Sequence, residues 1–311
     1  MNDTLFDAKP KLNRLPQNPD SSARGRFPKW LHMPMLEGET LFATDQILKD
    51  YKLNTVCEEA KCPNRLECFS KKTATFLLLG KACTRACGFC QIDFSKTPKP
   101  PEIDEPKRVA LSVKHLGLRH VVLTMVARDD LPDGGASHIN KVIQEIRIEN
   151  PETTLEVLTS DFAGNLSAVD TVLETHPEIF NYNIETVRRL TPSVRHKATY
   201  DRTLTILNHV KESRKSNFVK SGLMVGLGET LDEIKQTITD LHTAGTDIIT
   251  IGQYLQPSRL KLSVKAFIPP ETFKEYETYA YDIGVKHIYA GPFVRSSHNA
   301  SEILKTLLTK S

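Results

Sequence analysis

The apolar residues of this chain form short runs, which alternate with longer stretches where they recur every three or four positions. From residue 74 onward, six runs are rich in aliphatic and β-branched side chains, as is typical of buried strands. The predicted strands are Ala74–Leu79, His120–Val126, Leu155–Thr159, Ile179–Ile184, Phe218–Val225 and Ile248–Leu255. The predicted helices lie at about residues 107–116, 137–149, 166–174, 201–213, 230–243 and 271–283.

This alternation of strand and helix predicts right-handed βαβ units around a parallel sheet. Six units indicate an α/β fold, a partial (β/α)6 TIM-like barrel. A later strand-like run, Lys286–Tyr289, either closes the barrel or returns the chain to its N-terminal part. Functional side chains gather where barrel strands end. We therefore expect one mouth to hold Arg128–Asp130, Asn183, Glu185, Gly226–Glu229 and Gln253–Tyr254.

The N-terminal part does not follow this alternation. Residues 1–38 contain several prolines and few periodic apolar positions, which predicts an extended arm. Residues 39–72 combine a helical pattern with three cysteines and form a compact appendage in this interpretation. The barrel then covers residues 73–285, and residues 286–311 are a C-terminal closing segment.

Composition and charge narrow the class of protein. The 311 residues, 39% hydrophobic, can bury one large core, with two small domains as the alternative. The net charge of +3 comes from 41 basic and 38 acidic residues without a dense basic block, so we expect no nucleic-acid or membrane partner. The N-terminus has no apolar secretory segment. These features favour a cytoplasmic protein, and we expect a monomer.

All six cysteines lie in two tight triplets. The first is C-x4-C-x5-C at Cys57, Cys62 and Cys68, and the second is C-x3-C-x2-C at Cys83, Cys87 and Cys90. A disulfide framework is one alternative, but it lacks a secretory context. Structural zinc is another, but neither triplet has a fourth cysteine nearby. Three thiolates on a [4Fe–4S] cluster leave one iron open for chemistry, so we interpret the triplets as ligands of two iron–sulfur clusters.

The second triplet, with Phe89 before its last cysteine, resembles the signature of the radical S-adenosylmethionine (SAM) enzymes. In that superfamily the methionine part of SAM binds the open iron, and reductive cleavage yields a 5′-deoxyadenosyl radical. Gly226 and Glu229 resemble a fifth-strand element near the adenine. Gly134 and Gly135 stand where the superfamily binds the methionine amino group, although an ordinary turn before a helix also explains them.

Longer stretches resemble the lipoyl synthases. They are Thr55–Asn64, Thr73–Phe76, Arg128–Ala136, Asn183–Val187, Lys220–Thr230, Ile251–Ser258, Gly291–Pro292 and Arg295–Ser297. The resemblance implies insertion of two sulfur atoms, at C6 and C8 of an octanoyl group on a carrier protein's lysine. One SAM is consumed for each C–H bond, and the auxiliary cluster supplies the sulfur.

The same resemblance assigns residues to the two [4Fe–4S] clusters. The radical-generating cluster takes Cys83, Cys87 and Cys90, and the auxiliary cluster takes Cys57, Cys62, Cys68 and the serine ligand Ser297. A hydroxyl that caps a helix near residues 301–308 is the alternative for Ser297. Among the contacts to SAM we expect Asn183, Glu185 at the ribose hydroxyls and Arg195 at a carboxylate. Structural ion pairs are the alternative for Glu185 and Arg195.

The implied partners are an octanoylated lipoyl carrier domain or H protein, a flavodoxin- or ferredoxin-type electron donor, and an iron–sulfur carrier that repairs the auxiliary cluster. The chain departs from the family pattern at Phe69, usually tryptophan, at His298, usually tyrosine, and over residues 259–266. A diverged radical SAM enzyme that inserts sulfur into a related substrate is therefore one alternative. A non-catalytic iron–sulfur protein is the other.

Overall fold

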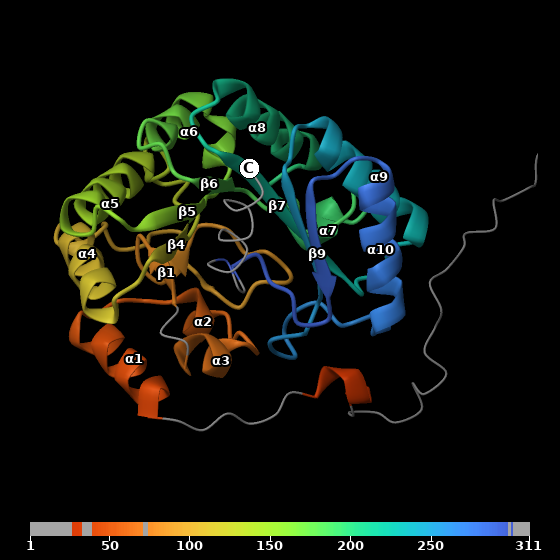
Figure 1. Ribbon diagram of the computed structural model, residues 1–311, viewed down its shortest axis with the longest axis horizontal. Coiled ribbons are helices and arrows are strands. Elements are labelled where there is room, and N and C mark those ends of the chain that lie inside the picture. Colours follow the sequence, from red (N-terminus) through yellow and green to blue (C-terminus); the bar gives the residue numbers. More distant parts are fainter. Residues whose placement is uncertain (1–26, 33–38, 71–73, 298–299, 301–311) are drawn as a thin grey trace, which may run out of the picture.

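The computed structural model describes residues 27–32, 39–70, 74–297 and 300. A seven-stranded parallel sheet forms its centre, with the strand order β1-β4-β5-β6-β7-β8-β9. The strands are β1 (Thr75–Leu78), β4 (His120–Met125), β5 (Thr154–Leu158), β6 (Ile179–Asn181), β7 (Phe218–Val225), β8 (Ile248–Gln253) and β9 (His287–Gly291). The sheet curves, and the helices cover its outer face (Figure 1).

The helices of the outer layer follow the predicted alternation. They are α4 (Glu105–Leu116), α5 (Ala136–Glu149), α6 (Leu166–Leu173), α8 (Tyr200–Ser213), α9 (Leu231–Thr243) and α10 (Pro270–Asp282), with the short α7 (Thr191–Val194) and η2 (Phe162–Gly164). Their apolar faces and the sheet form one large buried core. The capping box of Thr230 and Glu233 fixes the start of α9 directly after the β7 loop.

The seventh strand resolves the alternatives for the C-terminal run. Strand β9 pairs with β8 in parallel register, from Ile248 with His287 to Gly252 with Gly291. In the described part of the chain, β1 and β9 are the two edges of the sheet, so the barrel stays partial. The residues after β9 then run back to the appendage, where the Asn64 side chain donates to the Phe293 carbonyl at 2.8 Å. The run therefore extends the sheet without closing it, and it also returns the chain.

The cysteine-rich region packs beside the first strand. It contains α1 (Glu39–Asp50), α2 (Val56–Glu59) and α3 (Arg65–Ser70), and β2 (Ala82–Cys83) pairs with β3 (Asp93–Phe94) beyond β1. Of the predicted arm, residues 27–32 are described and include the short helix η1 (Lys29–Leu31). The rest of the arm and residues 301–311 lie outside the described residues, as does His298.

Candidate active site with two cysteine triplets

The loop that carries Cys83, Cys87 and Cys90 follows β1 and is fixed at the barrel mouth by backbone hydrogen bonds. The Thr84 amide donates to the Ala127 carbonyl at 3.0 Å, after β4. Gly88 donates to the Val194 carbonyl and accepts from the Leu262 amide, each at 2.9 Å. Loops that are distant in sequence thus hold both ends of the triplet, as expected at the C-terminal end of a parallel barrel.

The three thiols of this loop share one environment. Burial, with smaller contributions from the neighbouring Cys90 and Cys83, raises the pKa of Cys87 to about 12. Burial also raises the pKa of Cys90 to about 11, with a contribution from Cys83. The carboxylate of Glu185 acts on both thiols. The protein itself therefore does little to stabilise the thiolates of Cys87 and Cys90, whereas cationic iron would do so strongly, so this donor set fits a cluster.

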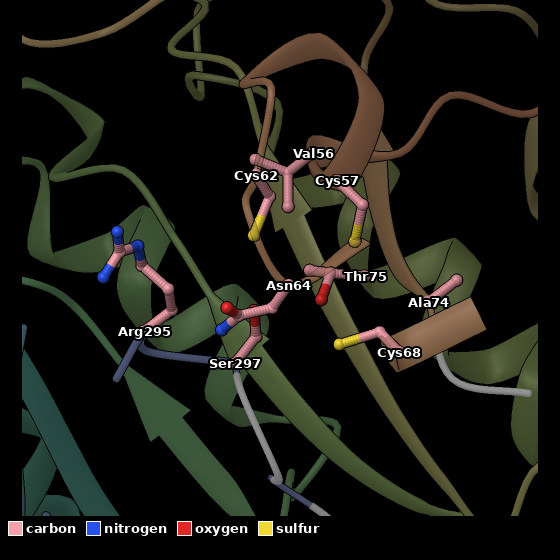
Figure 2. A pocket seen from close by; sticks show the side chains of 9 residues that line it. All are labelled: Val56, Cys57, Cys62, Asn64, Cys68, Ala74, Thr75, Arg295 and Ser297. Carbon is pink, nitrogen blue, oxygen red and sulfur yellow. The ribbon is translucent and has the colours of Figure 1, made fainter. Parts of the chain in front are cut away.

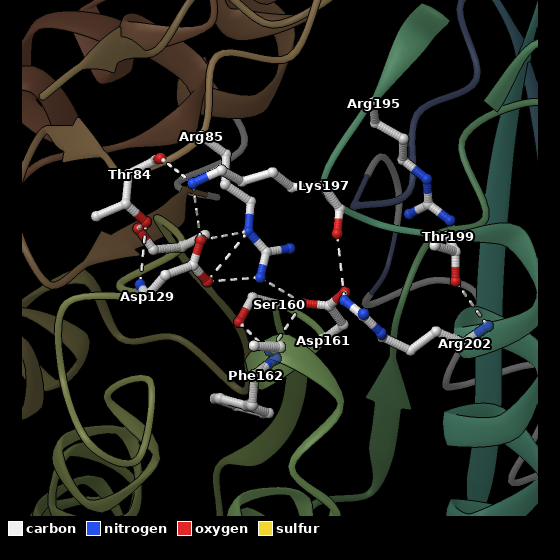
Figure 3. A network of polar contacts seen from close by, with 12 residues as sticks. Thr84, Arg85, Asp129, Ser160, Asp161, Phe162, Arg195, Lys197, Thr199 and Arg202 are labelled. Carbon is white, nitrogen blue, oxygen red and sulfur yellow. Dashed lines mark hydrogen bonds and ion pairs between the residues drawn. The ribbon is translucent and has the colours of Figure 1, made fainter. Parts of the chain in front are cut away.

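A buried guanidinium clamps the same loop to the barrel (Figure 3). Arg85 donates from Nε and Nη2 to the two carboxylate oxygens of Asp129, at 2.9 and 2.6 Å. Its Nη2 also lies 2.6 Å from Asp161 Oδ1, and Asp161 in turn pairs with Arg202 at 2.9 Å. Neither Arg85 nor Asp161 was predicted from the sequence as a site residue. Asp161 stands two residues after the third predicted strand, which was the available signal.

The Arg128-Asp129-Asp130 run separates into two structural roles. Arg128 is fully buried and donates to both oxygens of Asp130, at 2.8 and 2.7 Å, and to the Leu79 carbonyl. Asp129 instead faces Arg85. Both carboxylates therefore organise the mouth as structural partners of arginines.

Asn183, Glu185 and Arg195 form a second corner of the mouth. Asn183 Nδ2 donates to Glu185 Oε1 at 3.1 Å, and Arg195 Nη1 donates to the Asn183 carbonyl at 2.8 Å. Burial raises the pKa of the Glu185 carboxyl, which faces the cysteine loop. Glu185 has a positive φ of 66°, an unfavourable conformation for a non-glycine residue that is typical of functional sites. Arg195 Nε is buried without a hydrogen-bond partner, so this corner retains an unused donor.

The predicted glycines all have local structural reasons. Gly134 and Gly135 adopt φ of 62° and 93° in the turn before α5, and the Gly135 amide donates to Asp133 Oδ1 at 2.9 Å. Gly226 has a φ of 99° at the end of β7. Glu229 accepts from the Gly226 amide and, at 2.9 Å, from the Leu227 amide, so its carboxylate holds its own loop. Contacts of these residues with SAM stay predictions.

The first triplet and Ser297 line one pocket. Cys57 comes from α2, Cys62 from the following loop, Cys68 from α3, and Ser297 from the C-terminal segment. The three sulfur atoms and the serine hydroxyl surround a common space in Figure 2. Burial raises the pKa of Cys57 to about 11, and Cys62 adds to the rise. Four donors from separate segments therefore meet where a cluster would be held.

Further residues line this pocket or pack beside it. Asn64 and Arg295 also line it, and Asn64 binds the backbone of the C-terminal segment at Phe293. Phe69 is completely buried directly after Cys68, so this departure from the family retains an aromatic core residue.

In the part of the chain that the structure describes, no three His, Cys, Asp or Glu side chains could hold a single metal ion. A cubane requires no such convergence, because each ligand binds a different iron.

The comparisons with known proteins identify the family. Residues 77–241 match the model of the radical SAM superfamily. The chain is 59% identical over 301 residues to the lipoyl synthase of Protochlamydia amoebophila, covering 94% of this chain and 93% of that protein. It is 51% identical to the lipoyl synthase of Chlamydia trachomatis serovar L2, covering 93% of each chain. The chain belongs to the lipoyl synthase family.

This lipoyl synthase is thus a radical SAM enzyme of lipoate biosynthesis, a family that uses a [4Fe–4S] cluster and SAM. Its substrate class is a lipoyl carrier. A third relative, the lipoyl synthase of Chlamydia abortus, is 50% identical and is matched by 100% of this chain and 98% of its own length. No helix in the described ranges is long and apolar enough to cross a membrane.

Solved structures confirm the fold class. Streptococcus suis SuiB bound to S-adenosylmethionine matches with a TM-score of 0.54 at 11% identity, covering 73% of this chain and 54% of SuiB. The FeFe-hydrogenase maturase HydG from Carboxydothermus hydrogenoformans matches with a TM-score of 0.52 at 14% identity, covering 86% of this chain and 78% of HydG. The parallel sheet is therefore the partial barrel predicted from the sequence.

Proposed function

We propose that this lipoyl synthase divides its reaction between two [4Fe–4S] clusters, one on each cysteine triplet. The observation that carries the proposal is the meeting of Cys57, Cys62, Cys68 and Ser297 at one pocket, separate from the triplet at the barrel mouth. A family that only generates radicals would need the second triplet alone. The additional donor set therefore supports a sacrificial auxiliary cluster.

At the barrel mouth, Cys83, Cys87 and Cys90 would hold the radical cluster through three irons. Asn183 and Glu185 offer an amide and a carboxylate to the ribose hydroxyls of SAM, and Arg195 offers its unused Nε to a carboxylate. Gly134, Gly135 and Gly226 would contribute backbone groups, and Glu229 would hold the Gly226 loop in place. When bound, the cluster and SAM would supply a 5′-deoxyadenosyl radical, which abstracts a hydrogen atom from carbon.

At the auxiliary pocket, Cys57, Cys62, Cys68 and Ser297 would hold the cluster that provides sulfur. A serine oxygen binds iron more weakly than a thiolate does, which suits a cluster that is dismantled during turnover. The substrate would be an octanoyl group on the lysine of a carrier domain or H protein, with sulfur added at C6 and C8. We expect a flavodoxin- or ferredoxin-type donor, an iron–sulfur carrier for repair, and a cytoplasmic monomer.

The first experiment incubates the anaerobically reconstituted enzyme with SAM, dithionite and an octanoyl-lysine carrier peptide. We expect a peptide with two added sulfur atoms and release of 5′-deoxyadenosine, measured by mass spectrometry. An unchanged peptide with 5′-deoxyadenosine would retain the radical chemistry and indicate a related substrate. Absence of both products would contradict the proposal.

Matched cysteine variants separate the two clusters. Cys68→Ala should still release 5′-deoxyadenosine but insert no sulfur, because it removes a ligand only from the auxiliary pocket. Cys87→Ala should lose both activities, because radical formation precedes sulfur insertion. Full sulfur insertion by Cys68→Ala would refute the assignment of roles.

A further inference from the structure

Two adjacent serines near the C-terminus contact different sites. Ser297 lines the auxiliary pocket, whereas the Ser296 hydroxyl pairs with the Asn183 side chain at the barrel mouth. Asn183 Nδ2 donates to Ser296 Oγ at 2.8 Å, and Ser296 Oγ donates back to Asn183 Oδ1 at 3.0 Å. Because consecutive Cα atoms are about 3.8 Å apart, fixing Ser296 restricts where Ser297 can reach.

The sheet leaves room for this contact. A Cβ atom at Gly222, in the middle of β7, would collide with Thr250 Oγ1 at 2.5 Å and would also crowd Asn183 Oδ1 at 3.0 Å and Ser296 Oγ at 3.1 Å. At Gly252 on β8, a side chain would collide with the Val294 carbonyl. Glycine at both positions therefore leaves room for the C-terminal segment to pass close to β7 and β8. From the other side, Asn64 holds the same segment at Phe293.

The Asn183 amide is shared between two partners. Its Nδ2 donates to Glu185 as well as to Ser296, so both of its N–H groups have acceptors. A change at Ser296 therefore alters the donor offered to the Glu185 corner, and it also releases the segment that carries Ser297.

We propose that Ser296 is a positioning residue that ties the auxiliary pocket to the Asn183–Glu185 corner of the radical site. Through the backbone it keeps Ser297 within reach of the auxiliary cluster, and through Asn183 it orders the corner where SAM would bind. This inference rests on the proposed function, because it assigns Ser297 to the auxiliary cluster.

The first test isolates the auxiliary site in the full-length chain. A Cys83→Ala/Cys87→Ala/Cys90→Ala parent would contain only the auxiliary cluster, so the rate at which a chelator removes iron reports on that site. Ser296→Ala should accelerate iron loss on the order of tenfold, the usual effect of losing a residue that orients a metal ligand. Ser167→Ala, on the exposed face of α6, is the matched control and should have no effect.

A double-mutant cycle tests whether Ser296 acts through Ser297. Combining Ser296→Ala with Ser297→Ala should give no faster iron loss than Ser297→Ala alone. The inference would be overturned if the two substitutions multiplied each other's effect on the rate of iron loss. It would also be overturned if Ser296→Ala left that rate unchanged. A parent that binds no iron would instead refute the proposed auxiliary cluster, so the two failures are distinguishable.

The second test uses the chain with all six cysteines. Ser296→Ala should raise the KM for SAM severalfold in 5′-deoxyadenosine release, whereas Ser297→Ala should leave that KM unchanged. An equal KM in both variants would contradict the link to Asn183. If Ser296→Ala does not fold in thermal unfolding, Ser296→Thr and Ser296→Val form a second pair that differs in the hydroxyl. Only the valine variant should then show both the faster iron loss and the raised KM for SAM.

Discussion

At the scale of single residues, one guanidinium group holds the loop of Cys83, Cys87 and Cys90 against the barrel. Arg85 lies between Cys83 and Cys87 and reaches two carboxylates, Asp129 after β4 and Asp161 after β5. Its side chain is 7% exposed and that of Asp161 is 0% exposed. A planar guanidinium can satisfy several carboxylate oxygens at once, whereas an ammonium acts as a single point charge.

We therefore expect Arg85→Lys to weaken cluster binding at the barrel mouth while leaving the auxiliary pocket intact. The loss should be on the order of 10- to 100-fold in cluster retention, measured by iron content and by the electron paramagnetic resonance signal that changes on addition of SAM. Arg188→Lys is the matched control, because Arg188 pairs with Asp201 at the exposed surface. A normal SAM-dependent signal in Arg85→Lys would show that the clamp is dispensable.

Candidate ligands could be proposed from the sequence where the signal is local, and their binding of the clusters stays a prediction. The cysteine triplets reveal themselves by spacing, since few structures other than a metal site need thiols so close together. The role of Arg85 was not predicted because its partners lie 44 or more residues away in the sequence. In addition, a charged residue in a loop has many ordinary explanations. Ser296 was not predicted because its role depends on Asn183, which is 113 residues away in the sequence.

At the scale of elements, Asp247 joins four pieces of the barrel at the start of β8. Its carboxylate accepts from Lys211 of α8 at 2.7 and 2.8 Å, from the Val219 amide of β7 at 3.0 Å and from Lys286 at 3.2 Å. Its carbonyl accepts from the first residue of β9. Burial alone would raise the pKa of Asp247, but the bonds from Lys211 and Val219 outweigh burial and lower it.

A lowered pKa in the folded state fixes the sign of the pH dependence. The unfolded chain binds the proton more tightly, so this group stabilises the fold above about pH 4 and the contribution is lost as the pH falls further. Asp247→Asn should lower the free energy of unfolding at pH 7 by about 2 kcal/mol. Its loss of stability between pH 4 and pH 2 should also be smaller, as measured by urea unfolding. Asp201→Asn, at an exposed carboxylate, should change neither value appreciably. An equal loss of stability between pH 4 and pH 2 in both variants would show that Asp247 is not the source of this pH dependence.

Elements were predictable from the sequence where burial dictates composition. Strands such as β1 and β4 are nearly continuous apolar runs, because the strands of a parallel sheet are buried on both faces, whereas β5 and β7 also bury the ion pair of Glu156 and Lys220. The fourth strand ends at Asn181, three residues before its predicted end, because the chain turns toward the left-handed Glu185. The short pair β2 and β3 carries no apolar pattern, since Asp93 and Phe94 are exposed and the pair is fixed by the cysteine loop.

At the scale of the whole molecule, the two ends of the chain complete one site that neither end contains alone. The bond between Asn64 and Phe293 joins residues 229 positions apart. No periodicity predicts such a contact, and only the family resemblance suggested that Ser297 belongs with the first triplet. The bounds of the arm, appendage, barrel and C-terminal segment stay predictions, because contacts cross each of them.

The surface beside the radical site bears on how a protein substrate docks. Residues 259–266, where the chain departs from its family, bind the cysteine loop through Leu262 and Gly88. Arg259 and Lys265 are exposed in this segment, and Leu260 is 94% exposed. No ion pair joins either cation to a carboxylate within the described part of the chain. Because this segment contacts the cysteine loop, we expect the carrier to dock against it, and two exposed cations without an ion pair in the described residues favour a carrier with an acidic surface.

We therefore expect Arg259→Glu/Lys265→Glu to raise the KM for the intact octanoylated carrier by about tenfold at low ionic strength. The KM for a short octanoyl-lysine peptide should stay unchanged, because the peptide does not reach the segment. Salt should reduce the difference, since exposed charges are screened over about 10 Å at 0.1 M. Lys141→Glu/Lys274→Glu, on the outer helices α5 and α10, is the matched control. Equal increases for carrier and peptide would place these cations at the octanoyl-lysine itself, whereas no increase for either would mean that the carrier docks on another face.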